Sequence, residues 1–141
     1  MLHRLYPVIA TELVAETAAF WKERLGFDET FAADWYVSLR HPDSGAEIAF
    51  LDATHETIPA GHRKPAAGVL TNLEVDDVDA WWQRLVIEGG LAPLLPIRSE
   101  DFGQRHFIVA DPSGVLIDVI TEIPPTGEFV DAYTGGVAAA T

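Results

Sequence analysis

The sequence predicts an α+β protein built from two βαβββ modules, whose strands form a concave mixed sheet with the helices on its outer face. Two observations carry this prediction. The order strand, helix and three strands occurs twice along the chain. In addition, the hairpin "VSLRHPDSGAEIAFL" of the first half returns in the second half as "FIVADPSGVLIDVI". Each half is small for an independent core, at roughly 55 to 60 residues, which favours one domain made of both.

In the first half, a strand over residues 6–11 leads into a helix and three more strands. Apolar residues recur at helical spacing from Leu13 to Leu25, and Gly26 is a typical helix stop. Trp21 lies on the apolar stripe and is expected in the core. The three strands are expected over residues 29–33, 36–40 and 47–52, and the turn-forming residues "HPDSG" join the last two.

The second half repeats this order, beginning with a strand over residues 69–75. Asp76 is expected to cap a helix that ends at the Gly89-Gly90 pair. The apolar stripe of this helix consists of Val78, Trp81, Trp82, Leu85 and Val86. Three strands are then expected over residues 95–99, 106–110 and 115–121.

These elements divide the chain into four parts: a first module (1–53), an inter-module loop (54–68), a second module (69–122) and a C-terminal tail (123–141). The end of the tail is rich in glycine and alanine and is expected to be flexible. Phe129 and Tyr133 are candidate anchors for its earlier part.

The composition is that of a globular, soluble protein, with 48% hydrophobic and 22% charged residues. No apolar run reaches the roughly 18 residues of a membrane span, and no signal peptide is recognised. The chain has no cysteine, which excludes disulfides and thiolate sites and fits a cytoplasmic location. The formal net charge of −13 disfavours nucleic acid as a partner and favours cationic small molecules.

Three stretches resemble the vicinal oxygen chelate superfamily, which includes glyoxalase I, extradiol dioxygenases and bleomycin-resistance proteins. They are "PVIATELVAETAAFWKERLGF", "LEVDDVDAWWQRL" and "DFGQRHFIVADPSGVLIDVI". The first and last are most similar to bleomycin-resistance proteins, although Phe102 stands where those proteins usually have tryptophan. The resemblance implies the glyoxalase/bleomycin-resistance fold, a cleft enclosed by paired modules, a homodimer, and a small-molecule ligand, with antibiotics among the candidates.

The resemblance also implies a place for a divalent metal, held by side chains from the first and last strands of each module. Asp118 occupies the usual carboxylate position, but its repeat partner is Ala49. The first strands offer Tyr6 or Val8 in one module and Leu70 or Asn72 in the other. One suitable ligand in four does not make a metal site, so we expect neither metal nor cofactor.

The remaining candidates are aromatic and polar side chains expected to line the cleft. Trp35 and Tyr36 are neighbours on a strand, so one is expected to face the cleft and the other the helices. His41, His55 and His62 lie in turns or the loop and are expected to be solvated surface residues. The predicted ligand-binding set is Phe31, Asp34, Trp35, Tyr36, Phe50, Phe102, Arg105, His106 and Asp118.

Asp118 lies within an apolar strand, and a buried carboxylate needs compensation. The candidates for this are Arg105, His106, Asn72 and a bound cation.

Three functions fit this sequence. The first is a metal-free protein of the bleomycin-resistance type that sequesters a cationic or planar aromatic compound in a dimer cleft. The second is a lyase, isomerase or dioxygenase with one divalent metal per site, held by an atypical set such as His106, Asp118 and Glu47. The third is metal-free acid–base catalysis by Asp118 and His106.

Overall fold

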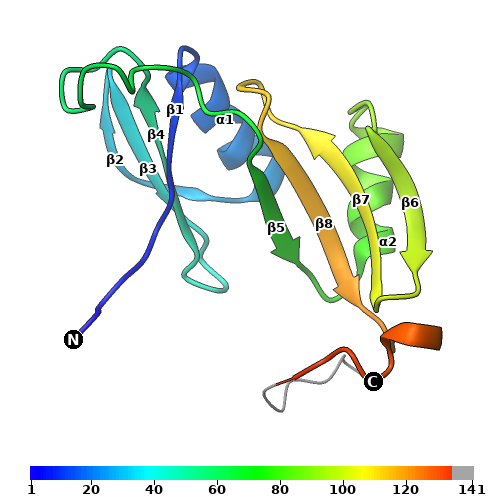
Figure 1. Ribbon diagram of the computed structural model, residues 1–141. Helices are drawn as coiled ribbons and strands as arrows, with labels where there is room; N and C mark the ends of the chain where they lie inside the picture. The colour runs from blue at the N-terminus through cyan, green and yellow to red at the C-terminus, as the bar shows by residue number, and fades with distance from the viewer. Residues whose placement is uncertain (135–141) are drawn as a thin grey trace. The chain divides into compact units, whose positions relative to one another are not determined.

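The computed structural model describes residues 1–134, and the chain divides into two compact units (Figure 1). The first unit consists of Met1–Val69 together with Asp111–Val115. The second consists of Leu70–Ala110 together with the chain from Leu116 onward. The expected flexible end of the tail falls mainly on residues 135–141, which lie outside the described residues. Within residues 1–134, no helix has the length and apolar character needed to cross a membrane.

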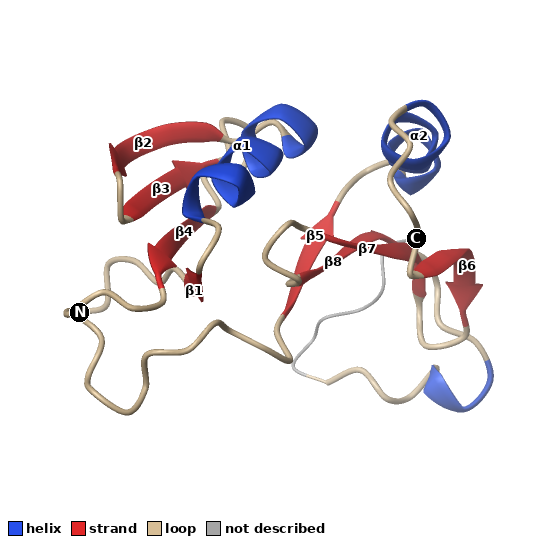
Figure 2. Ribbon diagram, turned by 90° about the horizontal axis from the view of Figure 1, so that it is seen from above, coloured by secondary structure: helices blue, strands red, loops and turns tan. Residues whose placement is uncertain are grey.

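The first unit contains one mixed four-stranded sheet and one helix, with the following elements: β1 (Val8–Thr11), α1 (Val14–Leu25), β2 (Asp28–Ala33), β3 (Tyr36–Arg40) and β4 (Glu47–Asp52). The strand order is β1-β4-β3-β2. β1 and β4 pair in parallel, whereas the other neighbours are antiparallel. The helix covers one face of the sheet (Figure 2).

α1 packs on this sheet through an apolar stripe at helical spacing. Val14, Trp21 and Leu25 are all buried, and Trp21 is only 2% exposed, as predicted for a core residue. The indole of Trp21 contacts the ring of Phe50 on β4, with 5.8 Å between ring centroids. The helix ends at Gly26, whose φ of +79° is favourable for glycine.

The second unit repeats the arrangement, with the following elements: β5 (Leu70–Glu74), α2 (Val78–Trp82), a π-type turn η1 (Gln83–Glu88), β6 (Leu95–Glu100), β7 (Gln104–Ala110), β8 (Leu116–Glu122) and a short 3₁₀ turn η2 (Gly127–Phe129). The strand order β5-β8-β7-β6 matches that of the first sheet, with β5 and β8 in parallel. α2 covers one face of this sheet (Figure 2).

The cap of α2 differs from the prediction by one residue. The capping side chain belongs to Asp77 rather than Asp76, because the Asp77 carboxylate accepts a hydrogen bond from Ala80 N at 3.1 Å. The adjacent tryptophans diverge. Trp82 contacts the buried Phe107 ring at 5.3 Å between centroids, whereas the Trp81 ring lies beneath the guanidinium of Arg84.

The two hairpins that revealed the repeat have matching geometry. Gly45 and Gly114 both adopt positive φ, +75° and +88°. Val8 is paired with Ala49 in the first sheet, and Asn72 is paired with Asp118 in the second. The α+β fold of two βαβββ modules is therefore confirmed, with strand bounds within two residues of those predicted. The strands form two four-stranded sheets.

Candidate functional site

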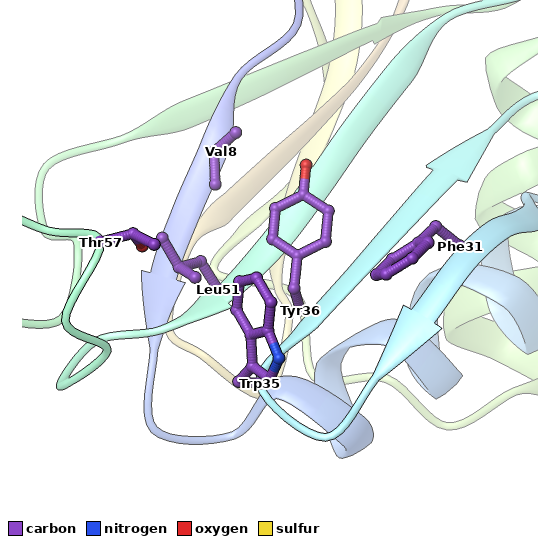
Figure 3. A pocket seen from close by; sticks show the side chains of 6 residues that line it. All are labelled: Val8, Phe31, Trp35, Tyr36, Leu51 and Thr57. Atoms are coloured by element: carbon purple, nitrogen blue, oxygen red, sulfur yellow. The ribbon is translucent and has the colours of Figure 1, made fainter.

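The first unit carries an apolar hollow of about 510 Å³ on the sheet face opposite α1 (Figure 3). Aromatic rings from β2, β3 and the turn between them form much of its lining, together with aliphatic side chains from β1 and β4 and one residue of the loop after β4. The lining residues are Val8, Phe31, Trp35, Tyr36, Leu51 and Thr57. A hollow of this size falls within the range of small-molecule sites.

Strand alternation explains which side chains reach the hollow. Val37 and Phe50 pair across β3 and β4 and are buried with α1, so their neighbours Tyr36 and Leu51 point to the opposite face. Tyr36 and Leu51 also pair with each other directly. Alternate residues of β3 and β4 therefore face the core under α1 and the hollow on the other side of the sheet.

Trp35 and Tyr36 both line the hollow, which corrects the expectation that only one of them would do so. The expectation assumed that both belong to one strand. β3 begins at Tyr36, and Trp35 lies in the preceding turn, where strict alternation does not apply. Their ring centroids are 5.7 Å apart (Figure 3).

The loop after β4 supplies the remaining wall. The His55 imidazole stacks flat on the Trp35 indole, with 4.0 Å between centroids and 9° between planes. His55 Nδ1 lies 2.9 Å from Thr57 Oγ1 and accepts a hydrogen bond from Thr57 N at 3.2 Å. His55 is therefore half-buried against an aromatic ring rather than a solvated surface residue. The same correction applies to His41, whose ring lies 5.0 Å from that of Phe27.

The hollow contains one titratable group of its own, the phenol of Tyr36. Burial raises the pKa of Tyr36, the nearby Tyr6 adds to the rise, and the guanidinium of Arg4 partly opposes it. The phenol therefore stays protonated at neutral pH. The lining offers a neutral, aromatic surface rather than a charged one.

A second cluster of polar side chains lies in the second unit, on β6, β7 and β8. His106 Nδ1 lies 2.7 Å from Asp118 Oδ1, and His106 Nε2 lies 3.0 Å from Glu100 Oε2. Arg98 donates two hydrogen bonds to the same Glu100 oxygen, at 3.1 and 3.0 Å. The side chains of His106 and Asp118 are only 6% and 9% exposed.

The protons of this cluster are set by its geometry. Each imidazole nitrogen of His106 faces a carboxyl oxygen. Neither contact is a hydrogen bond unless a proton lies on the nitrogen or on the oxygen that faces it. Burial raises the pKa of Asp118, and the hydrogen bond from His106 partly offsets the rise. Hydrogen bonds from His106 and then Arg98 lower the pKa of Glu100. His106 is thus the compensating partner of Asp118.

The residues at the expected metal positions do not fit a divalent ion. The paired positions are Val8 with Ala49 and Asn72 with Asp118, and only Asp118 offers a charged oxygen. The oxygens of Asp118 and Glu100 that contact His106 approach different nitrogens of one ring rather than a shared point. Among residues 1–134, no three His, Asp or Glu side chains are arranged to hold one ion.

The predicted site residues fall into three groups. Phe31, Trp35 and Tyr36 meet in the hollow. His106 and Asp118 meet in the polar cluster, and the Phe102 ring lies edge-on to His106 with centroids 6.2 Å apart.

The other predicted residues lie apart from both places. Phe50 is fully buried beside Trp21, on the side of the sheet that α1 covers. Arg105 points to α2 and forms a two-bond ion pair with Asp79, at 3.1 and 2.9 Å. Asp34 lies in the turn that contains Trp35 and is not among the lining residues.

Several residues of the hollow and of the polar cluster were not predicted from the sequence. Leu51 could have been found, because it shares strand parity with Ala49. His55 and Thr57 carry no periodic signal, since they lie in an irregular loop. Glu100 and Arg98 were hidden by an irregular register between β6 and β7, which shifts between Leu95 and Arg98.

Comparison with known proteins supports the fold. The family model described as "Glyoxalase/Bleomycin resistance protein/Dioxygenase superfamily" matches residues 4–119. No curated protein matches the sequence.

Three solved structures with the same fold share little sequence with this chain. A protein of unknown function from Agrobacterium tumefaciens is 23% identical, with a TM-score of 0.66 over 87% of this chain and 96% of its own. A lactoylglutathione lyase from the same organism is 16% identical, with a TM-score of 0.69 over 84% and 92%. A superfamily member from Sphaerobacter thermophilus is 22% identical, with a TM-score of 0.69 over 86% and 98%. At these identities the likeness concerns the fold alone.

Proposed function

Because this chain belongs to the Glyoxalase/Bleomycin resistance protein/Dioxygenase superfamily, we propose that it is a metal-free small-molecule binding protein. Its ligand presents a planar aromatic group to the hollow of the first unit. The aromatic lining formed by Phe31, Trp35 and Tyr36 carries this proposal. Flat rings stack on planar ligands and lose little conformational entropy when they do so.

The exposure of the lining supports a binding role. Phe31 is 53% exposed, Val8 42% and Trp35 38%, although all three are large apolar side chains. Contiguous exposed apolar surface of this kind is typical of binding sites. The net charge of −13 favours a ligand that is also cationic. Like the bleomycin-resistance proteins that the sequence resembles, the protein would sequester its ligand stoichiometrically, with an antibiotic among the candidates.

A matched pair of probes tests the proposal. Calorimetric titration with 1-methylquinolinium, a planar cation, is compared with titration of the neutral 1-methylnaphthalene. We expect both to bind, the cation more tightly, and Trp35→Leu to weaken both about threefold to tenfold through the loss of ring stacking. Trp81→Leu is the control, because Trp81 lies on α2 outside the hollow. The proposal would be refuted if neither probe binds, or if Trp35→Leu and Trp81→Leu weaken binding equally.

We further propose a homodimer, in keeping with the resemblance. Leu2 and Leu5 are 81% and 87% exposed in the N-terminal segment, and such leucines are suited to contact a second copy. Light scattering should then give twice the chain mass of 15.4 kDa. Replacing both leucines with serine should shift the protein toward the monomer, and a monomeric wild type would exclude this proposal.

The metal-dependent alternative has a direct test. Metal content is measured after the protein is soaked with Zn, Ni, Mn or Fe(II), in wild type and in Asp118→Ala. Since the residues at the metal positions do not fit an ion, we expect no stoichiometric metal in either protein. One metal per chain that is lost in the variant would favour a lyase or dioxygenase instead.

A further inference from the structure

His55 contacts two walls of the hollow without being one of its lining residues. Its ring stacks on Trp35, and its Nδ1 accepts a hydrogen bond from Thr57 N. Resting on the proposed function, we propose that uncharged His55 is a positioning residue that fixes these two walls. Its protonation then selects against cationic aromatic ligands.

The contact with Thr57 defines which nitrogen carries the proton. A backbone N–H can only donate, so His55 Nδ1 must be the unprotonated acceptor in this arrangement. The ring proton of uncharged His55 therefore lies on Nε2. A second proton would occupy Nδ1 and remove the acceptor from Thr57 N. The protonated Nδ1 would instead donate to Thr57 Oγ1, 2.9 Å away, so the contact moves from the backbone of Thr57 to its side chain.

The contact with Trp35 fixes the orientation of the largest ring in the hollow. Trp35 lies in a turn, where no strand register holds its side chain. The flat stack of His55 supplies that restraint, with 9° between the two planes. A charged imidazolium would keep the stack through a cation–π attraction but would place a positive charge against the indole. A ligand cation approaching the same indole would then be repelled.

The loop around His55 is well braced. Ile58 N donates to the backbone oxygen of His55 at 3.0 Å. The Arg63 guanidinium donates to the backbone oxygens of Ile58 and Glu56, at 2.8 and 3.3 Å. This bracing holds the loop in place, so a proton on His55 acts on the local Trp35 and Thr57 contacts.

The charged groups around His55 come from three segments. Asp52, at the end of β4, is held by Thr54, and its carboxylate interacts electrostatically with His55. Glu56 and Arg63 belong to the loop itself, and Asp34 belongs to the turn that carries Trp35. Hydrogen bonds from Thr54 lower the pKa of Asp52, so this carboxylate stays charged where histidines generally titrate.

One variant removes the titratable ring of His55 but keeps its stack. His55→Phe retains a flat ring for Trp35 but cannot accept a hydrogen bond from Thr57 N. His62→Phe is the control, because His62 is an exposed histidine of the same loop. His55→Phe cannot acquire a proton at this position between about pH 5.5 and about pH 8, the range used below.

The first measurement needs no ligand. Nitrogen-15 NMR of the histidine side chains should show His55 with its proton on Nε2 at about pH 8, where histidines in general are uncharged. Tryptophan fluorescence should then change as the pH is lowered, and His55→Phe should lose this change while His62→Phe keeps it. A proton on Nδ1 at high pH, or the same fluorescence titration in His55→Phe, would overturn the proposal.

The second measurement is calorimetric titration with 1-methylquinolinium and 1-methylnaphthalene at about pH 8 and about pH 5.5, on either side of the general histidine range. In wild type, we expect the cation to bind about threefold to tenfold more weakly at the lower pH, and the neutral probe to change less than about twofold. His55→Phe should lose this difference between the probes, and His62→Phe should keep it. General titration of surface carboxylates affects all three proteins alike.

The outcomes distinguish this inference from the proposed function. If 1-methylquinolinium binds equally well at both pH values, the role of His55 is refuted while the binding function stands. If neither probe binds at any pH, the binding function fails, and the selectivity assigned to His55 fails with it.

Discussion

In the second unit, two carboxylates share a single imidazole. Asp118 and Glu100 contact opposite nitrogens of His106, yet their pKa values shift in opposite directions. Asp118 is enclosed by the sheet, so burial is the largest influence on its pKa. Glu100 lies nearer to solvent and gains hydrogen bonds from both His106 and Arg98, which lower its pKa.

This contrast predicts how stability depends on pH. Because the pKa of Asp118 is raised in the folded state, the folded state binds its proton more tightly than the unfolded state does. Its contribution to stability is present at low pH and is lost as the pH rises through the folded pKa. Asp118→Asn cannot ionise and is spared this loss. Its free energy of unfolding, measured in urea and compared with that of wild type, should therefore rise from about pH 3.5 to about pH 7. A difference that does not vary with pH would contradict this.

Removing the partner altogether has a different expected effect. Asp118→Ala leaves Nδ1 of the buried His106 without its acceptor, which should cost about 1–3 kcal/mol of unfolding free energy at neutral pH. Asp118→Asn keeps an acceptor oxygen and should cost less. Equal stabilities of the two variants would show that the hydrogen bond contributes little.

Part of this polar cluster could be predicted residue by residue from the sequence. The repeat alignment placed Asp118 opposite Ala49, and His106 was among its candidate partners. Glu100 was not found, because its approach to His106 depends on a shifted register between β6 and β7. Such a bulge depends on how two strands meet, and neither strand alone shows it.

At the scale of elements, the described part of the tail, residues 123–134, forms hydrogen bonds with the turn between β6 and β7, residues 101–103. Ile123 N donates to the backbone oxygen of Gly103 at 3.0 Å, and Thr126 N donates to that of Asp101 at 2.8 Å. The Tyr133 hydroxyl donates to the backbone oxygen of Phe102. The Phe129 ring lies edge-on to that of Phe102, so both predicted anchors contact this turn.

Gly103 lies where the tail packs so closely on the turn that there is no room for a side chain. A Cβ there would lie 2.6 Å from the Tyr133 hydroxyl and 3.0 Å from the backbone oxygen of Ile123, and φ is +108°. Gly103→Ala should therefore lower the unfolding free energy by about 1–3 kcal/mol. Gly68→Ala is the matched control, since Gly68 also has positive φ (+71°) but nothing within 4 Å of the added atom. Similar losses in the two variants would indicate that backbone strain alone is responsible.

Most elements could be predicted because hydrophobic periodicity and turn residues agree along the chain. The "HPDSG" and "DPSG" turns fixed both hairpins. The cap of α2 was misplaced because Asp76 and Asp77 are chemically identical candidates. The π-type turn at Gln83–Glu88 was missed, since only Leu85 and Val86 of the expected apolar stripe lie within it, too few to distinguish one kind of helical turn from another.

At the scale of the whole molecule, charge is the dominant property. The chain has 22 acidic and 9 basic residues, so most of its charges repel one another at neutral pH. The fold class was predictable because a repeated βαβββ order leaves few alternatives. The hollow was only partly predictable, because one of its walls comes from an irregular loop.

The charge excess predicts a response to salt. Raising NaCl from about 0.02 M to about 0.5 M at pH 7 should increase the melting temperature by a few degrees, because salt screens the repulsion in the folded state. The same salt series near the sequence pI of about 4.5 should give little increase and serves as the control. A melting temperature that falls with salt at pH 7 would show that attractive ion pairs dominate instead.

The Trp21 indole donates its N–H to the carboxylate of Asp111 at 2.9 Å, and 90 residues separate the two in the chain. Asp111–Val115 belongs to the first compact unit, although it joins two strands of the second. During synthesis, the strands and helix of the first unit are therefore complete well before its last segment leaves the ribosome. Until then the most buried tryptophan of that unit lacks its hydrogen-bond acceptor, so the first half of the nascent chain can reach its final form only after most of the second half has been made.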